Sequence, residues 1–305
     1  MDRKNLFTNK FMVIFFTMIA SFLWGSAFPV LKISYQELGL GPDDVWEKVF
    51  FAGIRFFLAA VIVLISFMLK KYKPGLSKNN YKSLFILGIM QTSLQYFFFY
   101  NGLANTSGIS AAILSSGGSF FVVILSHFVY HDDKIDIGKT IGLLTGFAGI
   151  VLVNFGSGFS LNFTFKGEGY LILSALISAI ATIYAKKISG KINPVAVSAF
   201  QMLFGSLMLL TSGFIFSGFN LLSFTLTAFF LLIYSSFLSA TAFAIWYTLL
   251  KYNKAGEISI YRFMIPIFGS FLSAVLIPGE KITLMSLIAL ALVAGGIWFV
   301  NSRKE

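Results

Sequence analysis

The sequence contains no cysteine, which excludes disulfide bonds, thiolate nucleophiles and metal sites built on thiolates. It also has few charged residues, 11% of 305, whereas about a quarter of the residues in a soluble protein are charged. So few charges cannot cover a water-exposed surface of this size, and 57% of the residues are hydrophobic. The composition therefore indicates that the apolar surface faces lipid, with the bilayer as a partner.

Acidic residues are scarcer than basic ones, and the formal net charge is +11. A nucleic-acid-binding domain gathers its basic residues on one face of a soluble fold. Here the lysines and arginines lie in short gaps between apolar runs, where membrane topology would place them. The charge therefore reports orientation in a membrane, and no nucleic-acid partner is expected.

Histidine is also rare. His127 and His131 are four residues apart and are followed by Asp132 and Asp133, a spacing that occurs in metal sites. Two histidines are too few for the histidine-rich centre of a membrane metalloenzyme, and the cluster suits a helix end at the membrane interface. Neither a metal ion nor another cofactor is expected.

Ten apolar segments approach the length of about 20 residues that a helix needs to cross a bilayer. They are residues 11–31, 49–69, 84–103, 109–130, 140–155, 169–185, 195–216, 226–250, 258–277 and 284–300. The first is longer than the core of a signal peptide and is interpreted as a retained helix. A lone strand would leave backbone groups unpaired in lipid, and the runs lack the alternation of a membrane barrel. The predicted fold is an all-α membrane protein with ten transmembrane helices.

The basic residues divide unequally between the two sides of such a bundle. With the N-terminus inside, the inner segments hold 17 lysines and arginines and the outer segments hold 4. Because short cytoplasmic loops are enriched in basic residues, both termini are predicted to be cytoplasmic. The expected location is the cytoplasmic membrane, as a multi-pass protein.

The sequence also contains an internal repeat, visible when the chain is shifted by 147 residues. The connector Asp132-Asp133-Lys134-Ile135 then falls on Gly279-Glu280-Lys281-Ile282, and the shift also aligns Ser126 with Ser273, Gly149 with Gly296 and Asn154 with Asn301. Two five-helix halves are predicted, residues 1–155 and 156–305. Because five is odd, the second half starts on the opposite side of the membrane, and the halves form inverted repeats, as in many secondary transporters.

These features resemble the drug/metabolite transporter superfamily, specifically its EamA-like branch, over nearly the whole chain. The resemblance rests on Trp24-Gly25-Ser26-Ala27-Phe28-Pro29, Arg55, Asn101-Gly102-Leu103, Thr106-Ser107 and Pro278-Gly279-Glu280. The chain departs from the family where Ser115-Ser116-Gly117-Gly118-Ser119 replaces a proline of the fourth helix and Asp132-Asp133 replaces a Gly-Glu pair. The resemblance implies a duplicated ten-helix fold and export or exchange of small metabolites such as amino acids.

The predicted function is a secondary transporter that moves a small organic metabolite, an amino acid or related compound, by alternating access. The sequence has no nucleotide-binding loop, so a gradient or exchange would drive transport, and Glu47, Glu168 and Glu257 lie at segment ends rather than at membrane depth. The alternatives are a membrane-embedded enzyme acting on a lipid or isoprenoid, which would need a richer cluster than His127 to Asp133, and a channel. The protein is not expected to be an enzyme, and its oligomeric state stays open, a monomer included.

In the family that the chain resembles, the first, third, fourth, eighth and ninth helices surround a central cavity. The substrate-binding residues predicted on these helices are Trp24, Gln91, Gln95, Ser115, Tyr234, Tyr261 and Arg262. Arg262 lies inside a span and would either bind an anionic substrate group or extend to the membrane interface. Gln91 and Gln95 share one helix face and would either line a polar pathway or bond neighbouring helices.

Other marked residues have structural interpretations. Arg55 is expected to bond backbone carbonyl groups between helices. Pro29 and Pro266 interrupt the helix hydrogen bonds and allow kinks. Gly117-Gly118 and the Gly142/Gly146 pair are typical of close helix packing. Trp24 lies beside Pro29 and would close over a substrate or lie at the membrane interface, where Trp46, Trp246 and Trp298 are also expected.

Overall fold

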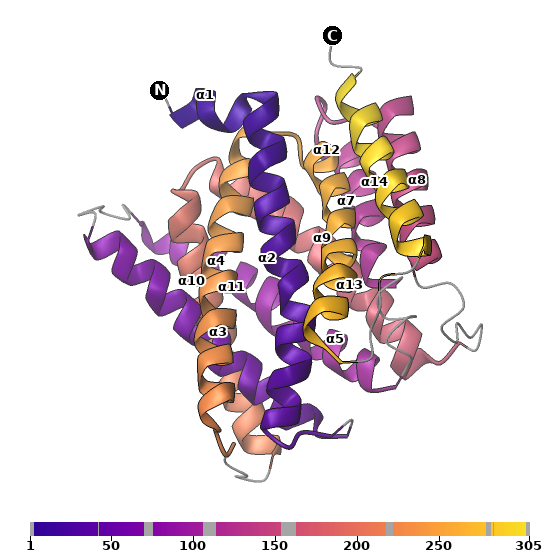
Figure 1. Ribbon diagram of the computed structural model, residues 1–305. Helices are drawn as coiled ribbons and strands as arrows, with labels where there is room; N and C mark the ends of the chain where they lie inside the picture. The colour runs from indigo at the N-terminus through magenta and orange to yellow at the C-terminus, as the bar shows by residue number, and fades with distance from the viewer. Residues whose placement is uncertain are drawn as a thin grey trace.

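The computed structural model describes residues 3–41, 43–69, 76–105, 114–153, 163–217, 222–278, 282 and 284–302. These ranges form one bundle of helices, and they contain no strand (Figure 1). The helices are α1 (Arg3–Thr8), α2 (Lys10–Glu37), α3 (Val45–Leu69), α4 (Lys78–Gly88), α5 (Gln95–Ala104), α7 (Gly118–Val129), α8 (Ile137–Val153), α9 (Tyr170–Ser189), α10 (Pro194–Phe216), α11 (Leu226–Tyr252), α12 (Ala255–Ile260), α13 (Met264–Leu276) and α14 (Leu284–Ser302). Three short elements continue these helices: the π-helical turns η1 (Ile89–Leu94) and η2 (Phe165–Gly169), and the 3-10 turn η3 (Tyr261–Phe263).

Six helices are long and apolar enough to cross a membrane: Lys10–Glu37, Val45–Leu69, Phe165–Ser189, Pro194–Phe216, Leu226–Tyr252 and Ala255–Leu276. Three shorter helices are also apolar, Leu114–Val129, Ile137–Leu152 and Leu287–Val300. The predicted segment 84–103 lies in a helix that runs without interruption through α4, η1 and α5. The prediction of helices is therefore confirmed in the described ranges, while residues 109–113 and 154–155 of the predicted segments lie outside them.

Local sequence signals set the starts of several helices. Pro194 occupies the first turn of α10, where its missing N–H costs no helical hydrogen bond, and the Asn193 side chain accepts a 3.0 Å hydrogen bond from the N–H of Val195. The hydroxyl of Thr225 accepts one of 3.0 Å from the N–H of Ala228 at the start of α11. These caps fix the point at which each helix begins.

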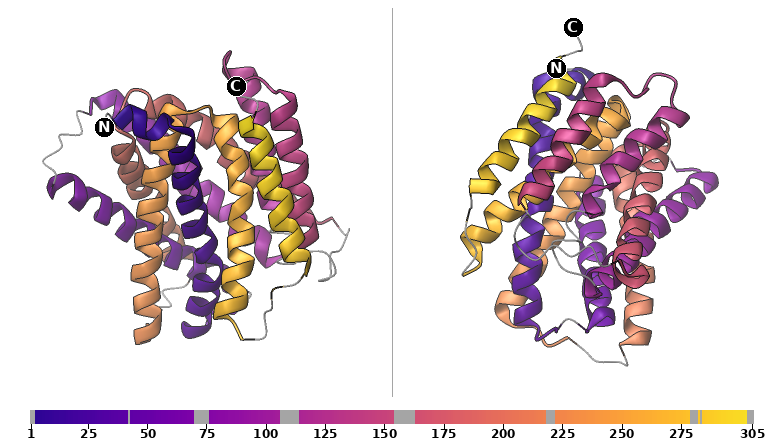
Figure 2. Two further views of the ribbon diagram at one scale, coloured as in Figure 1. Left: turned by 45° about the horizontal axis from the view of Figure 1, so that its top comes forward. Right: turned by 90° about the vertical axis from the view of Figure 1, so that its right-hand side faces the viewer.

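The helices pack in a small number of extensive pairs. α3 packs against α10, and α8 against α14, while α2 lies between α11 and α13, and α9 contacts α5 and α7. The start of α1 and the end of α14 lie at the same end of the bundle, which we call the terminal end (Figures 1 and 2).

Glycines allow the closest of these contacts, as the sequence predicts for Gly142 and Gly146. A Cβ added at Gly142 would lie 2.6 Å from Val300, and one at Gly146 would lie 2.3 Å from the ring of Phe263. At Gly118 the nearest atom, the carbonyl oxygen of Ala175, would be at an ordinary 3.6 Å. The packing role is therefore confirmed for Gly142 and Gly146, whereas Gly118 makes no unusually close contact.

Gly205 of α10 gives a direct test of this packing. A Cβ at this position would lie 2.4 Å from Cβ of Thr92 and 2.5 Å from the carbonyl oxygen of Gly88, whereas a Cβ at Gly295 meets no atom within 4 Å. We expect Gly205→Ala to destabilise the protein by about 1–3 kcal/mol, because two helices must move apart. Gly295→Ala, the matched control, should leave stability unchanged or raise it slightly. Thermal unfolding of the two purified variants measures the difference, and equal midpoints would show that the contact at Gly205 relaxes freely.

Candidate functional site

Arg262 lies in the interior of the bundle, on the 3-10 turn between α12 and α13. Its guanidinium carbon is 5.8 Å from the ring centroid of Trp246, a side chain that is only 3% exposed. Tyr96 and Tyr247 are the ionisable side chains close enough to act on its charge. Arg262 follows the start of α12 by seven residues, about 10 Å along a helix. These contacts place the guanidinium against interior aromatic residues rather than at the helix end.

Arg55 is the second arginine inside the bundle, and it is 3% exposed on α3. Its guanidinium carbon lies 4.3 Å from the ring centroid of Phe56 and 5.7 Å from that of Tyr96. Sequence reasoning expected bonds to backbone carbonyl groups, but Nε and Nη1 of Arg55 have no hydrogen-bond partner. The guanidinium of Arg55 is therefore surrounded by aromatic rings, which attract a cation only weakly.

A chain of ring contacts connects the two arginines. Trp24 contacts Phe243 at 5.4 Å and Trp246 at 5.6 Å between ring centroids. Phe56 contacts Phe243 at 6.3 Å and Tyr96 at 4.7 Å. These residues come from α2, α3, α5 and α11, so helices far apart in the sequence meet here. We call Trp24, Arg55, Phe56, Tyr96, Phe243, Trp246, Tyr247 and Arg262 the arginine–aromatic cluster.

Several buried polar atoms in and beside this cluster lack hydrogen-bond partners. They include Nε and Nη1 of Arg55 and the hydroxyl group of Tyr247. The hydroxyl groups of Tyr35 and Tyr100 lie close enough to one another to pair, and Tyr35 is within electrostatic range of Arg55. An unpaired buried polar atom costs about 1–3 kcal/mol, and most such atoms in folded proteins are paired. The region is therefore suited to a ligand with polar or charged groups.

Gln95 directly precedes Tyr96 on the same helix, and Gln91 lies one turn before Gln95. Nε2 of Gln91 donates a 2.5 Å hydrogen bond to Oε1 of Gln95, so the two amides pair with each other rather than with another helix. Gln91 belongs to the π-helical turn η1, where Thr92 donates a 2.7 Å hydrogen bond to Gln201 and Ser93 one of 3.0 Å to the carbonyl oxygen of Gly205. Such turns are frequent at functional sites, and this one fixes the helix of Tyr96 against α10.

Ser115 lies one turn before Ser119, which bonds α12, and Tyr261 directly follows α12. The Ser115 hydroxyl is buried without a partner, and Ser119, four residues later, donates a 3.0 Å hydrogen bond to the carbonyl oxygen of Ser259 on α12. Tyr261 is 2% exposed and packs with Ile260 and Phe263. Tyr261 also lines a pocket with Thr8, Lys10, Val13, Asn253, Glu257, Ile258 and Val300. Tyr261 thus lies in the packed core beside the arginine–aromatic cluster and is not one of the rings in contact within that cluster.

Tyr234 differs from its predicted position. It is 37% exposed, on the same side of α11 as Phe230 and Phe237, which are 62% and 53% exposed. Its hydroxyl forms a 2.8 Å hydrogen bond with the hydroxyl of Ser26 on α2. Because this side of α11 is directed outward, we leave Tyr234 out of the candidate site.

Trp246 corrects another expectation, since it was placed in an interfacial belt. It is buried on α11 between Trp24 and Arg262. Trp298, by contrast, is 65% exposed, as a belt residue would be. Of the two prolines, Pro29 is buried within the continuous helix α2, and Pro266 lies in the first turn of α13 directly after η3.

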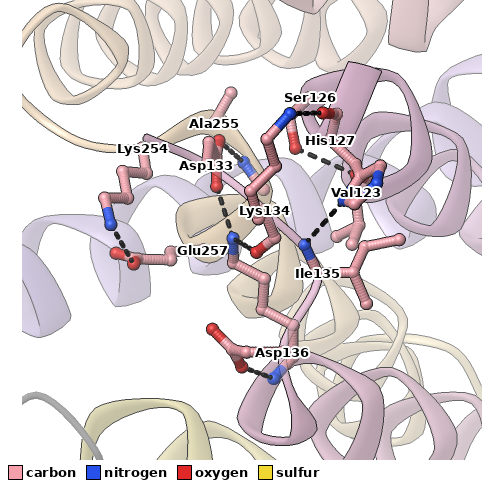
Figure 3. A network of polar contacts seen from close by, with 12 residues as sticks. Val123, Ser126, His127, Asp133, Lys134, Ile135, Asp136, Lys254, Ala255 and Glu257 are labelled. Atoms are coloured by element: carbon pink, nitrogen blue, oxygen red, sulfur yellow. Dashed lines mark hydrogen bonds and ion pairs between the residues drawn. The ribbon is translucent and has the colours of Figure 1, made fainter. Parts of the chain in front are cut away.

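A second polar network lies where α7, α8 and α12 meet, at the terminal end of the bundle (Figures 1 and 3). Lys139 of α8 forms a 2.6 Å ion pair with Asp133, and the two residues are only 2% and 1% exposed. The other carboxylate oxygen of Asp133 accepts a 2.8 Å hydrogen bond from the N–H of Gly256, in the first turn of α12. A carboxylate at a helix N-terminus is favourable because the helix dipole is positive there. Asp133 thus attaches the connector after α7 to both α8 and α12.

His127, one of the two histidines of the predicted cluster, belongs to this network. Nδ1 of His127 accepts a 3.0 Å hydrogen bond from the N–H of Ile135, and its carbonyl oxygen accepts one of 2.7 Å from Lys134. Among the residues that the structure describes, no group of three or more metal-ligating side chains lies together.

Sequence reasoning missed four aromatic members of the cluster and the role of a fifth. Trp246, Tyr247 and Leu250 follow Phe243 by three, four and seven residues, so these side chains lie on one face of α11. All of them are buried. Phe56 and Tyr96 each follow a residue that the sequence had marked. The helical spacing of the aromatic residues at 243, 246 and 247 is the sequence signal that could have indicated one buried face of α11.

Comparison with known proteins identifies the fold. The EamA-like transporter family matches residues 11–155 and 165–302. The uncharacterized transporters YvbV and YetK of Bacillus subtilis are 27% and 30% identical to this chain. The matches cover 93% and 83% of this chain and 89% and 78% of those proteins. The WAT1-related protein At3g02690 of Arabidopsis thaliana, described as chloroplastic, is 25% identical, over 92% of this chain and 67% of its own length.

A solved crystal structure matches with a TM-score of 0.76 over 94% of this chain and 96% of its own, and at 16% identity it shows the fold alone. The apolar helices and the transporter relatives together make this chain a multi-pass membrane protein. The resemblance to the drug/metabolite transporter superfamily is confirmed, and this chain belongs to the EamA-like transporter family.

Proposed function

We propose that the protein is a secondary transporter that moves a small organic metabolite, an amino acid or related compound, across the cytoplasmic membrane by alternating access. The observation that carries this proposal is the arginine–aromatic cluster. Arg262 lies among helices from both halves of the chain and contacts Trp246. A guanidinium inside a membrane bundle needs compensation, and a substrate carboxylate would supply it.

The proposed architecture is ten transmembrane helices in two inverted halves, residues 1–155 and 156–305. Two contacts between α8 and α14 support it. A Cβ at Gly149 would lie 3.0 Å from the carbonyl oxygen of Ala289, and one at Gly296 would lie 3.2 Å from that of Gly142. A shift of 147 residues turns the first contact into the second. Later residues of α8 meet earlier residues of α14, so the two helices are antiparallel. A two-fold rotation that exchanges two antiparallel helices has its axis perpendicular to both. For membrane-spanning helices that axis lies in the membrane plane.

The other helix pairs support the same symmetry. The proposed repeat pairs α2 with α9, α3 with α10, the helix α4–α5 with α11, α7 with the helix α12–α13, and α8 with α14. With this pairing, helix contacts in one half have counterparts in the other. The packing of α2 on α11 corresponds to that of α9 on α5, and α2 on α13 corresponds to α9 on α7. Two related halves that rock against each other would open a central site to either side in turn.

The proposed substrate site lies between these halves. From the sequence it keeps Trp24 and Arg262, with Gln91, Gln95 and Ser115 as polar groups of the pathway. Tyr96, Trp246 and Tyr247 join it because they contact or act on Arg262. Tyr261 becomes a packing residue beside it, since its side chain is buried in the core.

An enzyme remains the alternative of a different class, and the relatives speak against it because they are named transporters. The polar cluster that sequence reasoning considered for catalysis is His127 to Asp133. His127 and Asp133 are bonded to the backbone and to Lys139, which supports a structural role for the cluster.

Transport into proteoliposomes tests the proposal. Purified protein should catalyse saturable counterflow of radiolabelled amino acids or related metabolites, with no chemical change of the labelled compound. Flux that does not saturate would indicate a channel, and a labelled product would indicate an enzyme. Either result would contradict the proposal.

The proposed orientation, with both termini cytoplasmic, predicts a labelling pattern. Lys191 and Lys166 are exposed and lie at opposite ends of α9, and the chain has no natural cysteine. In intact cells, a cysteine at Lys166 should react with a membrane-impermeant maleimide, whereas a cysteine at Lys191 should react only after the membrane is permeabilised. The reverse pattern would invert the topology. Lys73, another suitable cytoplasmic position by sequence, lies outside the described residues.

A further inference from the structure

The arginine–aromatic cluster holds two positive charges and no described negative one. Neither Arg55 nor Arg262 forms an ion pair with an acidic residue in the described ranges. Several acids have partners elsewhere, among them Asp133 with Lys139, Glu257 with Lys254 and Glu37 with Thr225. A single carboxylate at Arg262 would therefore leave the charge of Arg55 uncompensated.

The two arginines share one neighbour, Tyr96. Arg55 lies 5.7 Å from the Tyr96 ring, and Tyr96 is close enough to both Arg55 and Arg262 to be influenced by their charges. Tyr96 is on α5, Arg55 on α3 and Arg262 on η3. Tyr96 therefore lies near one arginine of the first half, Arg55, and one of the second half, Arg262. A compact substrate beside Tyr96 would therefore meet both guanidinium groups.

The aromatic rings do not compensate these charges. A cation–π contact contributes about 0.5–2 kcal/mol, whereas removing an ion from water costs several kcal/mol even after relaxation. The buried Nε and Nη1 of Arg55 also have no acceptor, although a guanidinium presents its donors in a fork that matches two oxygen atoms. Both facts call for an anionic group at Arg55 as well as at Arg262.

We propose that the substrate is a dianion, either a dicarboxylate or a phosphate monoester, whose negative charges contact Arg55 and Arg262 on either side of Tyr96. This inference rests on the proposed transporter function, and it assigns the small organic metabolite to the dianions in place of an amino acid or related compound. It also gives Arg55 a role in substrate binding in place of the structural role that the sequence suggested.

A ligand series of constant shape tests the charge requirement. Succinate, succinamate and succinamide have the same carbon chain and carry two, one and no negative charges at neutral pH. Glycerol 3-phosphate and glycerol form the corresponding pair for a phosphate monoester. Because a ligand stabilises the state that it binds, each compound is titrated into the purified protein while the unfolding midpoint is measured. We expect a dianion to raise the midpoint more than its less charged analogue, and the phosphate pair distinguishes the two chemical sources.

Arg55→Gln separates binding from structural support. The variant should weaken binding of the effective dianion about tenfold or more, the effect expected from losing a hydrogen-bonded charge, while binding of succinamate changes little. Arg55→Lys should restore part of the preference, because it restores the charge without the fork. The control is Lys191→Gln, which removes one exposed charge at the turn after α9 and should leave the series unchanged. The midpoint without ligand and the size-exclusion profile report folding of every variant.

Three results would overturn the inference. They are equal stabilisation across each series, no stabilisation by either dianion, and an unchanged preference in folded Arg55→Gln. The carrier itself is judged separately by counterflow. If a zwitterion such as glutamine is exchanged while the dianions have no effect, the transporter function stands and the dianion assignment is wrong. If counterflow is absent for all compounds, the proposed function fails as well.

Discussion

Arg262→Ala is expected to abolish transport, and Arg262→Lys to remove most of it, while both proteins still fold. The alanine variant loses the charge that is proposed to bind the substrate anion. The lysine variant keeps a charge but loses the planar fork that can hold two oxygen atoms at once. A hydrogen bond to a charged group contributes about 1.5–3 kcal/mol, so its loss corresponds to roughly a 10- to 150-fold weaker interaction.

The measurement is counterflow in proteoliposomes at equal protein density. Lys191→Ala serves as the matched control, because it removes a positive charge that is exposed between α9 and α10. Size-exclusion profiles and unfolding midpoints establish that each variant is folded before its rate is compared. Arg262→Ala with the wild-type rate would show that Arg262 does not bind the substrate, and a neutral or cationic substrate would then replace the anion.

The contacts of Arg262 support the expected loss of transport more directly than its position in the sequence does. Arg262 and Glu257 are five residues apart, and Glu257 instead forms a 3.6 Å ion pair with Lys254. The 3-10 turn η3 also places Tyr261 and Phe263 in the core while Arg262 lies against Trp246. The break between α12 and α13 therefore orients the guanidinium toward the cluster and its neighbours toward the packed core.

The helical fold was predictable because lipid tolerates few alternatives. A run of about 20 apolar residues must pair its own backbone groups, and only a helix does this within one segment. The ends of helices were less predictable. α2 continues to Glu37, six residues past the predicted end at 31, because polar residues such as Lys32 extend the helix beyond its apolar part. In the same way, α4 begins at Lys78, before the apolar run that starts at 84.

The site was only partly predictable because rotation about the helix axis is hard to infer for an apolar helix. α11 carries aromatic residues around its circumference, so its sequence does not distinguish buried Trp246 from exposed Tyr234. Contacts with α2 decide this: Trp24 packs on Trp246, and Ser26 bonds Tyr234 at the side of the helix. Arg262 and Trp24, both marked from the sequence, lie on either side of Trp246.

Breaking the ion pair between Asp133 and Lys139 is the change with the largest expected effect on stability. Both side chains are almost inaccessible, so neither charge can be compensated by water. Asp133→Asn keeps the shape and an acceptor for Gly256, but it leaves the ammonium group of Lys139 with the carbonyl oxygen of Lys134 as its described partner. Removing one partner of a buried pair costs about 3–5 kcal/mol, which corresponds to a midpoint lower by roughly 5–10 °C.

Two further variants identify the pair as the cause. Asp133→Asn combined with Lys139→Met removes both charges, so the double variant should be less unstable than the sum of the single variants, since the unpaired charge is gone. Lys254→Gln is the control from the same network, because its ion pair with Glu257 is longer, at 3.6 Å, and the Lys254 side chain is 43% exposed. Exposed pairs contribute at most about 1 kcal/mol, so this midpoint should barely change. If Asp133→Asn and Lys254→Gln lowered the midpoint equally, the charge of Lys139 would have to reach water, and Asp133 would no longer count as the residue that attaches α8 to α12.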